Sequence, residues 1–260
     1  TTEIYTLSLH DALPILFIHG WGVDGRIWRQ QSRYFSSYYK VICVDLPGHG
    51  QTAWQPLTLE QIAADVSFLL QRIGCASYGI VASSFGGLVA LRLAGLEVDF
   101  IKALVLVGSQ ARFIKDEAYP YGLEVERLRK LSGQLDSDYP AIVNIFFRSL
   151  FTRQERASRR YKWIQTFRRT EARPDKEALL GLLDILEKAD LREQLLRVPQ
   201  ALQFINGTED YICPRALYED LSDQLPAARF DWMPQCGHFP FLIQPGVFNQ
   251  LLERFLLAVL

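Results

Sequence analysis

The chain has 260 residues, of which 49% are hydrophobic and 22% are charged, and its formal net charge is −1. This composition excludes a disordered chain, and the length is sufficient to bury a large core. The near balance of charge argues against nucleic-acid binding by the whole chain, and the lack of a run of about 18 apolar residues excludes a membrane-spanning helix.

The N-terminal region carries the weakest pattern. Residues 1–14 show no clean strand period and resemble translated adapter sequence, so we treat them as artefactual and base no prediction on them. We expect no signal peptide. The four cysteines form no C-x-x-C pair and are too few for a disulfide framework, which predicts reduced thiols and a cytoplasmic location. We also expect a monomer.

Short apolar runs bounded by glycine, proline or polar residues are typical of buried strands. There are six: Ile15–Ile18, Val41–Val44, Tyr78–Ala82, Lys102–Val107, Ala201–Ile205 and Arg229–Met233. Helical patterns lie among them at Leu59–Ile73, Leu88–Leu96 and Val247–Leu260. Strands that alternate with helices predict βαβ units, and hence a mostly parallel sheet covered by helices on both faces.

The alternation stops between residues 111 and 188. Four helical stretches occupy this region: Leu123–Leu131, Tyr139–Phe151, Arg153–Phe167 and Lys176–Glu187. A helical insertion of this size between two parallel strands is a candidate lid. We therefore predict three segments, with core residues 1–110, a helical lid at 111–188 and the remaining core at 189–260. The window from Arg148 to Arg173 is strongly basic, with nine basic and two acidic residues.

The sharpest local motif runs from Ala82 to Gly87, with the letters ASSFGG, at the end of a predicted strand. A strand that turns directly into a helix is the context of a catalytic nucleophile, usually with the pattern G-x-S-x-G. Ser84 fits better than Ser83, because it has small residues two positions before and after it. Ala82 departs from the usual glycine. The alternative is a serine- and glycine-rich turn without chemistry.

A serine nucleophile needs a base, and an acid that orients the base. In this type of enzyme the acid and then the base follow the serine along the chain, and His238 is the histidine that satisfies this order. The acid follows the preceding strand, where Glu209 and Asp210 are both candidates. The pattern G-x-x-D before an apolar residue and proline favours Asp210. Its alternative role is the N-cap of a helix that starts near Pro214.

The oxyanion of the reaction needs two backbone N–H donors. Phe85 follows the nucleophile and supplies one, and Trp21, in the loop after the first predicted strand, supplies the other. We expect His19 and His49 to shape glycine-rich loops. No two histidines have the spacing of a metal site, and no nucleotide-binding glycine motif is present, so we expect neither metal nor cofactor.

The chain as a whole resembles the α/β-hydrolase superfamily, and within it the pimeloyl-[acyl-carrier protein] methyl ester carboxylesterases of biotin synthesis. The motifs that carry the resemblance are His19-Gly20-Trp21-Gly22, Asp45-Leu46-Pro47-Gly48-His49-Gly50, Ser84-Phe85-Gly86-Gly87, Gly181–Leu186 followed by Asp190-Leu191-Arg192, and Gly237-His238-Phe239-Pro240. The likeness runs from about residue 15 to the C-terminus. It implies the α/β-hydrolase fold, with a mostly parallel sheet, flanking helices and a helical lid inserted between strands.

The resemblance also implies an activity and a partner. A serine carboxylesterase of this family hydrolyses the methyl ester of pimeloyl-[acyl-carrier protein] through an acyl-enzyme, with Ser84, Asp210 and His238 as the triad. The lid would form the acyl channel, with Phe146, Phe147, Arg148, Ser149 and Leu150 on its substrate face. The acidic acyl-carrier protein would dock on basic lid residues, namely Arg156, Arg159, Arg160 and Lys162.

Three alternatives stay open. A general short-chain carboxylesterase, or another cofactor-free α/β-hydrolase such as a C–C bond hydrolase, would use the same triad on free small molecules. A non-catalytic binding protein of the same fold predicts a broken triad, and all three members are present. The basic residues between Arg148 and Arg173 distinguish these alternatives only weakly, because a charged helix often simply exposes its charged face to solvent.

Overall fold

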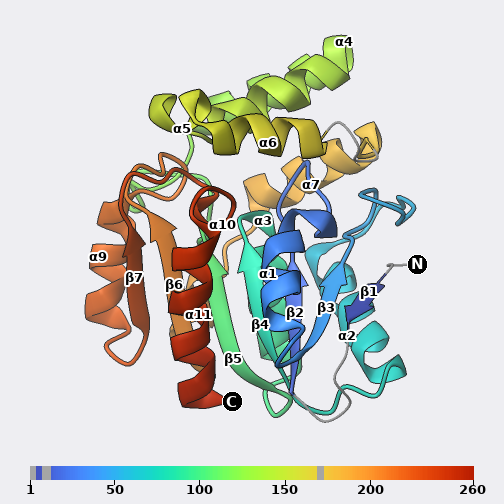
Figure 1. Cartoon of the computed structure of the whole chain (residues 1–260). Helices are drawn as coiled ribbons and strands as arrows, with labels where there is room; N and C mark the ends of the chain where they lie inside the picture. Colours follow the sequence, from blue (N-terminus) through green and yellow to red (C-terminus); the bar gives the residue numbers. More distant parts are fainter. Residues whose placement is uncertain (1–3, 8–12, 169–172) are drawn as a thin grey trace.

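The computed structural model describes residues 4–7, 13–168 and 173–260. A seven-stranded sheet with the order β1-β3-β2-β4-β5-β6-β7 runs through it (Figure 1). The strands are β1 (Ile4–Leu7), β2 (Pro14–Ile18), β3 (Lys40–Val44), β4 (Tyr78–Ser83), β5 (Ile101–Val107), β6 (Ala201–Gly207) and β7 (Arg229–Met233). All neighbours are parallel except β1 and β3. The six predicted strands are thus confirmed within two residues at either end.

Residues 1–14, for which the sequence analysis made no prediction, contain one strand and the start of another. Ile4–Leu7 forms β1, which pairs antiparallel with Val41–Val44, and Pro14 begins β2. A four-residue edge strand is too short to show a period, and its partner lies far along the chain, so local sequence does not reveal it. Residues 1–3 and 8–12 lie outside the described residues.

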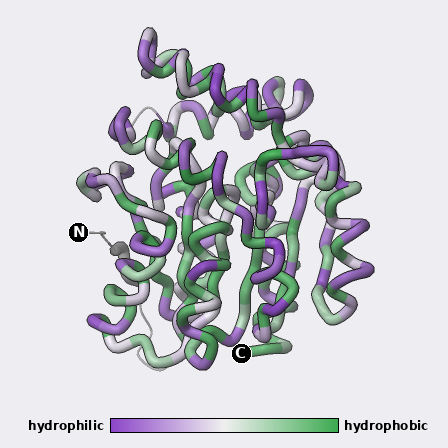
Figure 2. Tube along the Cα trace, turned by 180° about the vertical axis from the view of Figure 1, so that it is seen from behind, coloured by the Kyte–Doolittle hydropathy of each residue, from purple (hydrophilic) through white to green (hydrophobic). Residues whose placement is uncertain are grey.

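Helices cover both faces of the sheet, as predicted. One face carries α1 (Arg29–Phe35) and α11 (Pro245–Val259), and the other carries α2 (Leu59–Arg72), α3 (Phe85–Leu96), α8 (Arg192–Leu196) and α9 (Arg215–Gln224). On β6, Gln203 contacts the α11 backbone while Phe204 packs on Tyr218 of α9. Figure 2 shows the resulting hydrophobic strands between more hydrophilic outer helices. The sequence analysis did not predict α1, α8 and α10 (Pro240–Ile243), because these helices are too short for a clear helical period.

The helical insertion lies between β5 and β6. It contains α4 (Val125–Ser149), α5 (Arg153–Ala157), α6 (Arg159–Arg168) and α7 (Lys176–Lys188). Two predicted helices merge in α4, which is kinked at Asp138 (φ −151°) two residues before Pro140. Proline removes a helical hydrogen bond and clashes with the preceding turn, which accounts for the kink. One predicted helix is instead divided into α5 and α6, because Ser158 has extended backbone angles.

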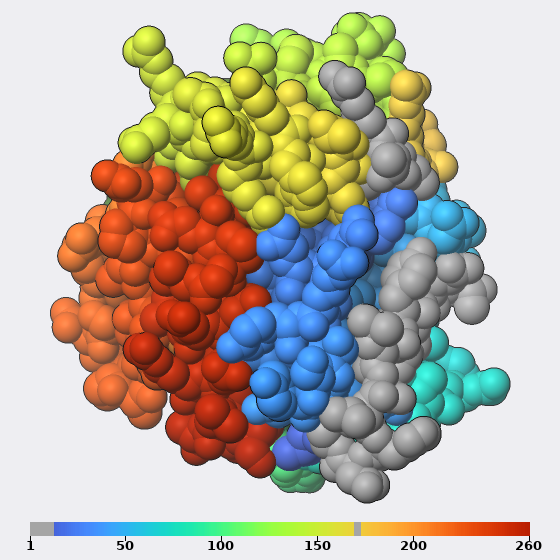
Figure 3. All heavy atoms as spheres, in the orientation of Figure 1, coloured from blue at the N-terminus to red at the C-terminus, as the bar shows by residue number. Residues whose placement is uncertain are grey.

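The insertion crosses the carboxyl ends of the strands (Figure 1). α7 packs against α4, and α6 rests on both the N-terminal and the C-terminal parts of the core (Figure 3). Arg160 Nε donates to the Leu242 carbonyl of α10 at 2.6 Å, and the Arg29 guanidinium of α1 lies 6.0 Å from the Phe167 ring. Within the described ranges, no helix combines the length and apolar character needed to cross a membrane.

Candidate active site

Ser84 occupies a strained turn between β4 and α3. Its φ is +53° and its ψ is −125°, a conformation that is costly for a residue with a side chain. A Cβ on Gly86 would lie 2.4 Å from the His19 carbonyl oxygen, and one on Gly20 would lie 2.9 Å from Ser84 Cβ. These close approaches explain both glycines and bring the Ser84 side chain against the loop after β2. Ser83 is fully buried, so it faces away from solvent.

His238 and Asp210 form a buried pair. His238 Nδ1 lies 2.8 Å from Asp210 Oδ2, while Asp210 Oδ1 accepts hydrogen bonds from the backbone N–H groups of Ile212 and Cys213. An imidazole that donates from Nδ1 keeps its lone pair on Nε2, as a general base requires. The neighbouring Glu209 is exposed. Asp210 does not cap α9, because the N-cap of that helix is Pro214.

The turn after β5 connects Ser84 to this pair, a contribution that the sequence analysis missed. Ser109 Oγ donates to the Ser84 carbonyl at 2.7 Å. The preceding Gly108 has a φ of +51°, and a Cβ there would lie 3.2 Å from His238 Nδ1 and 3.3 Å from Asp210 Oδ2. One tight turn therefore contacts the serine on one side and the acid–base pair on the other. The Gly-Ser dipeptide after a strand was the available signal.

The two predicted oxyanion donors lie beside Ser84. Phe85 begins α3, and Trp21 follows Gly20 in the loop after β2. In the described part of the chain, no hydrogen bond engages the backbone N–H of either residue. The Trp21 indole donates to the Leu179 carbonyl of α7 at 3.0 Å and meets the Phe146 ring edge-on at 5.0 Å. Its side chain thus joins this loop to the insertion.

His19 and His49 cross-link two glycine-rich loops. His19 Nε2 accepts from the Leu46 N–H at 2.9 Å, and His49 Nε2 accepts from the Gly22 N–H at 3.2 Å. Burial lowers the pKa of both imidazoles, that of His49 to about 3, so both rings are neutral. This arrangement agrees with the loop-shaping role expected for them.

The insertion holds the loop that carries the base, which the sequence analysis did not foresee. The His238 N–H donates to the Leu150 carbonyl at 3.0 Å, and the Gly237 N–H donates to Glu155 Oε1 at 2.8 Å. Glu155 is buried, and its Oε2 accepts from the N–H of Thr152 in a capping box at the start of α5. Burial raises the pKa of this carboxyl. The local signal was the Thr-x-x-Glu capping pattern.

The residues of the predicted acyl channel, 146–150, do not all face the interior. Phe146 packs on Trp21, and Phe147 lines a cavity, but Arg148 is exposed. Ser149 Oγ lies 3.0 Å from the Tyr211 hydroxyl, and Leu150 contributes its carbonyl to His238. The two phenylalanines therefore face the interior, while the last residues of the segment anchor the end of α4.

The four predicted docking residues divide into two pairs. Arg159 and Lys162 are exposed on α6. Arg156 donates to the Phe151 carbonyl, and Arg160 binds the Leu242 carbonyl and stacks 4.4 Å above the Trp163 ring. Burial lowers the pKa of Arg160, whose Nη2 is buried without a partner in the described residues. Arg156 and Arg160 thus secure the insertion, and the first pair is better placed to meet a partner.

Asp210, Cys213 and His238 also form a cluster of potential metal ligands, with donor atoms within 4.8 Å of one another. Their chemistry fits an acid–base pair better than an ion. Asp210 Oδ2 and His238 Nδ1 already bind each other, and burial holds the pKa of the Cys213 thiol well above its ordinary value, so the thiol stays protonated.

Comparison with curated proteins gives full-length relatives. A model of the alpha/beta hydrolase family matches residues 15–251. A Nitrosomonas europaea protein named pimeloyl-[acyl-carrier protein] methyl ester esterase is 30% identical over 234 residues, which are 90% of this chain and 92% of the relative. A Vibrio cholerae protein of the same name is 28% identical over 256 residues, 98% of each chain.

Solved structures share the fold. The enol-lactonase from Burkholderia xenovorans LB400 has a TM-score of 0.87 at 22% identity, covering 98% of this chain and 96% of that one. A thermophilic esterase from Thermogutta terrifontis has a TM-score of 0.85 at 23% identity, covering 99% and 93%. The named relatives confirm the predicted enzyme class, a carboxylic ester hydrolase. With its sheet, its flanking helices and a family match over most of its length, the chain belongs to the alpha/beta hydrolase family.

Proposed function

We propose that the chain is a serine carboxylesterase that hydrolyses the methyl ester of pimeloyl-[acyl-carrier protein] in biotin synthesis. The substrate is supported by relatives of that name that match nearly the whole chain. The observation that carries the chemistry is the buried hydrogen bond of 2.8 Å between His238 and Asp210. The turn of Gly108 and Ser109 lies between this pair and the strained Ser84. The buried, free cysteines are compatible with a cytoplasmic location.

The reaction proceeds in two steps. Ser84 Oγ attacks the methyl ester carbonyl while His238 Nε2 takes the hydroxyl proton, and that proton then passes to the departing methoxide, which leaves as methanol. Water next attacks the acyl-enzyme, His238 takes a proton from it and returns one to Ser84, and the carboxylic acid is released. Asp210 orients the imidazole and stabilises its charged form. The N–H groups of Trp21 and Phe85 stabilise the oxyanion in both steps.

The helical insertion serves in this proposal as the lid at residues 111–188. Phe146 and Phe147 line the path of the acyl chain, which suits an apolar heptanedioyl group. Arg159 and Lys162 meet the acidic carrier protein, because exposed charges of opposite sign accelerate association. Leu150, Arg156 and Arg160 hold the insertion in place through hydrogen bonds that involve backbone groups.

The direct test supplies methyl pimeloyl-[acyl-carrier protein] to the purified protein and follows loss of the methyl group by mass spectrometry. The proposal expects demethylation by the wild type and none by Ser84→Ala. Growth of a biotin auxotroph that lacks its pimeloyl-ester esterase provides the matching test in cells. Failure of both tests, with an active preparation on p-nitrophenyl butyrate, would overturn the substrate assignment.

A general carboxylesterase for free short esters is the second candidate. It is favoured by the fact that Arg156 and Arg160 direct hydrogen bonds to backbone carbonyls of the chain itself, which leaves a smaller basic surface. The two candidates differ in the ratio of kcat/KM for the carrier-linked ester to that for free monomethyl pimelate. A ratio well above one supports the carrier-linked substrate, and a ratio near or below one supports the free ester.

A further inference from the structure

The backbone carbonyl of Ser84 accepts hydrogen bonds from two different parts of the core. The Gly87 N–H of α3 donates to it at 2.9 Å, and the Ser109 hydroxyl of the turn after β5 donates to it at 2.7 Å. The first bond belongs to the opening turn of the helix. The second comes from a side chain that has no part in the proposed proton transfers, so its role needs another explanation.

The Ser109 hydroxyl is itself held firmly. Ser109 is fully buried, and its carbonyl accepts a hydrogen bond from the Tyr218 hydroxyl of α9 at 2.9 Å. A Cβ on Gly87 would overlap the Ser109 hydroxyl oxygen, so that oxygen occupies the space that a side chain at position 87 would fill. This close approach explains the last glycine of the ASSFGG motif, and it keeps the hydroxyl against the Ser84 carbonyl.

The bond from Ser109 orients a whole peptide unit. The Ser84 carbonyl and the Phe85 N–H belong to the same peptide, which is planar and trans, so the two groups point in opposite directions. A contact that fixes the carbonyl therefore also fixes the N–H, which is a predicted oxyanion donor. A hydrogen bond accepted by the carbonyl polarises the peptide as well, and this makes its N–H a stronger donor.

The Phe85 N–H is available for an oxyanion. Phe85 is fully buried, and among the described residues no hydrogen bond engages its N–H. Buried N–H groups without a partner are rare in folded proteins, because they are costly. The peptide that carries this N–H starts from the strained Ser84, with a φ of +53° and a ψ of −125°. A strained conformation persists only where its surroundings hold it, and Ser109 supplies such a contact.

We propose that Ser109 is a positioning residue that orients and strengthens the Phe85 N–H as an oxyanion donor. Ser109 acts through the peptide between Ser84 and Phe85, so it needs no contact with the substrate. This role rests on the proposed serine esterase mechanism and deepens it. The role does not depend on which ester is the natural substrate, because every ester forms an oxyanion at the same place.

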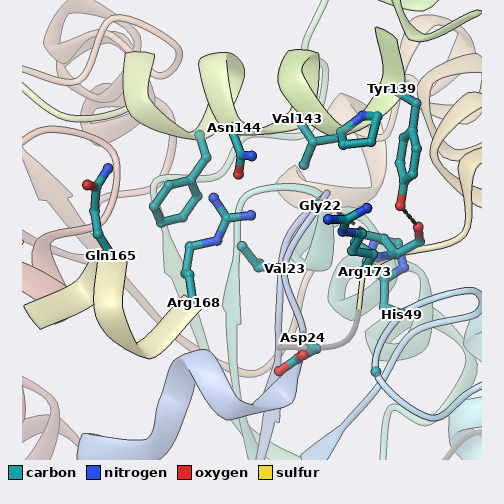
Figure 4. Close-up of a pocket in the computed structure, with 14 residues that line it drawn as sticks. Gly22, Val23, Asp24, His49, Tyr139, Val143, Asn144, Gln165, Arg168 and Arg173 are labelled. Carbon is teal, nitrogen blue, oxygen red and sulfur yellow. Dashed lines mark hydrogen bonds between the residues drawn. The ribbon is translucent and has the colours of Figure 1, made fainter. Parts of the chain in front are cut away.

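The space that an acyl chain can occupy lies away from Ser109. A cavity of about 380 Å³ lies beneath the helical insertion, next to the predicted oxyanion loop. Its described lining includes Gly22 and Val23 of that loop, and Val143 and Asn144 of α4 (Figure 4). Ser109 is not among the described residues that line it. Loss of the Ser109 hydroxyl should therefore weaken stabilisation of the oxyanion and leave binding of the uncharged ester unchanged.

Ser109→Ala tests this role on p-nitrophenyl butyrate. We expect kcat to fall about fivefold, the effect of losing one neutral hydrogen bond. KM should stay the same, because acylation and deacylation both pass through an oxyanion and are slowed together. Ser109→Thr keeps the hydroxyl and should retain most of the activity. Ser222→Ala is the matched control, because the Ser222 hydroxyl donates to the Glu219 carbonyl at 2.7 Å, at an exposed position of α9.

A matched pair of inhibitors separates positioning from a purely structural role. With a trifluoromethyl ketone that carries a pentyl chain, Ser84 Oγ bonds to the carbonyl carbon, His238 takes the hydroxyl proton, and the ketone oxygen becomes an oxyanion. The methyl ketone with the same pentyl chain binds as the intact ketone. Ser109→Ala should raise the inhibition constant of the first compound about fivefold and leave that of the second unchanged.

The outcomes distinguish failure of this role from failure of the proposed function. An unchanged kcat in Ser109→Ala, or an equal fall in Ser222→Ala, would overturn the positioning role. An equal rise of both inhibition constants would also overturn it, because Ser109 would then support the shape of the pocket. Loss of activity in Ser84→Ala would still support the serine mechanism in each of these cases. Retained activity in Ser84→Ala would overturn the proposed mechanism and the role of Ser109 together.

Discussion

The turn of Ser84 and the loop of His238 reach the same site but are held there in different ways. Ser84 is fixed by contacts among β4, α3 and the loop after β2, all inside the hydrolase core. The His238 loop donates two hydrogen bonds to the insertion, from its backbone N–H groups to the Leu150 carbonyl and to the Glu155 carboxylate. The nucleophile therefore depends on the rigid sheet, whereas the position of the base depends also on the helices above it.

This difference, together with the exposed surface of the insertion, separates three kinds of residue. Changes at the turn should remove the chemistry and leave the fold unaffected. Changes at the contacts between insertion and loop should weaken catalysis partially, because they shift the base without removing it. Changes on the exposed surface of the insertion should alter only the recognition of a large substrate, not the catalytic step.

The largest expected effect is at Ser84 and His238. Ser84→Ala should lower kcat on p-nitrophenyl butyrate by roughly 10³-fold or more, His238→Ala should match it, and the double variant should be little worse, because the two act as a unit. Circular dichroism should show an unchanged fold. Retained activity in Ser84→Ala with loss in Ser83→Ala would move the nucleophile by one residue.

The acid should follow in size. Asp210→Asn keeps the shape of the side chain but weakens its hold on His238, so kcat should fall, by roughly 10- to 100-fold less than it falls in Ser84→Ala. Glu209→Gln is the matched control, because Glu209 is exposed and adjacent, and it should be close to wild type. The opposite ranking in the same assay would make Glu209 the acid.

The contact through Glu155 should give an intermediate effect. Glu155→Gln leaves one acceptor oxygen for two backbone N–H groups, so the His238 loop should loosen and kcat should fall about tenfold with little change in KM. Glu177→Gln, at an exposed position of α7, is the control. A change in KM alone would mean that Glu155 acts on substrate binding and does not position the base.

Glu155 also predicts a pH dependence of stability. Its pKa is raised above the ordinary value of 4.5, so its contribution to stability is present below that pH and is lost as pH rises through the folded-state pKa. The unfolding free energy of the wild type should therefore decline between pH 4.5 and the folded-state pKa of Glu155, relative to that of Glu155→Gln. Denaturant titrations at several pH values measure the difference, and parallel curves would show that the carboxyl does not titrate there.

The smallest expected effect is at the exposed basic pair. Arg159→Glu/Lys162→Glu should raise KM for methyl pimeloyl-[acyl-carrier protein] about fivefold at low salt, since exposed charge pairs contribute ~0.5–1 kcal/mol each. Added salt should reduce the difference. Arg72→Glu/Lys102→Glu, at the opposite end of the sheet, is the control. An equal rise in KM for a small free ester would indicate a disturbed lid.

The core could be predicted from the sequence because its signals are local. Most of the predicted strands are short, largely apolar runs, and the Ser84 turn needs small residues at fixed spacing, so both are visible in a short window of sequence. His238 followed from chain order, and the pattern G-x-x-D before an apolar residue and proline favoured Asp210 over Glu209. Phe85 and Trp21 followed from their place beside these motifs.

The tertiary structure decided what depends on contacts between distant segments. The edge strand Ile4–Leu7 is recognisable by its pairing with β3. Glu155 reads as a helix cap until the fold brings Gly237 to it, 82 residues along the chain. Arg160 has the pattern of a surface charge, and only the fold brings the Leu242 carbonyl to its guanidinium. Bringing such distant segments together lowers the entropy of the chain, and only the interactions of the complete fold offset this loss. No local sequence pattern therefore encodes these contacts.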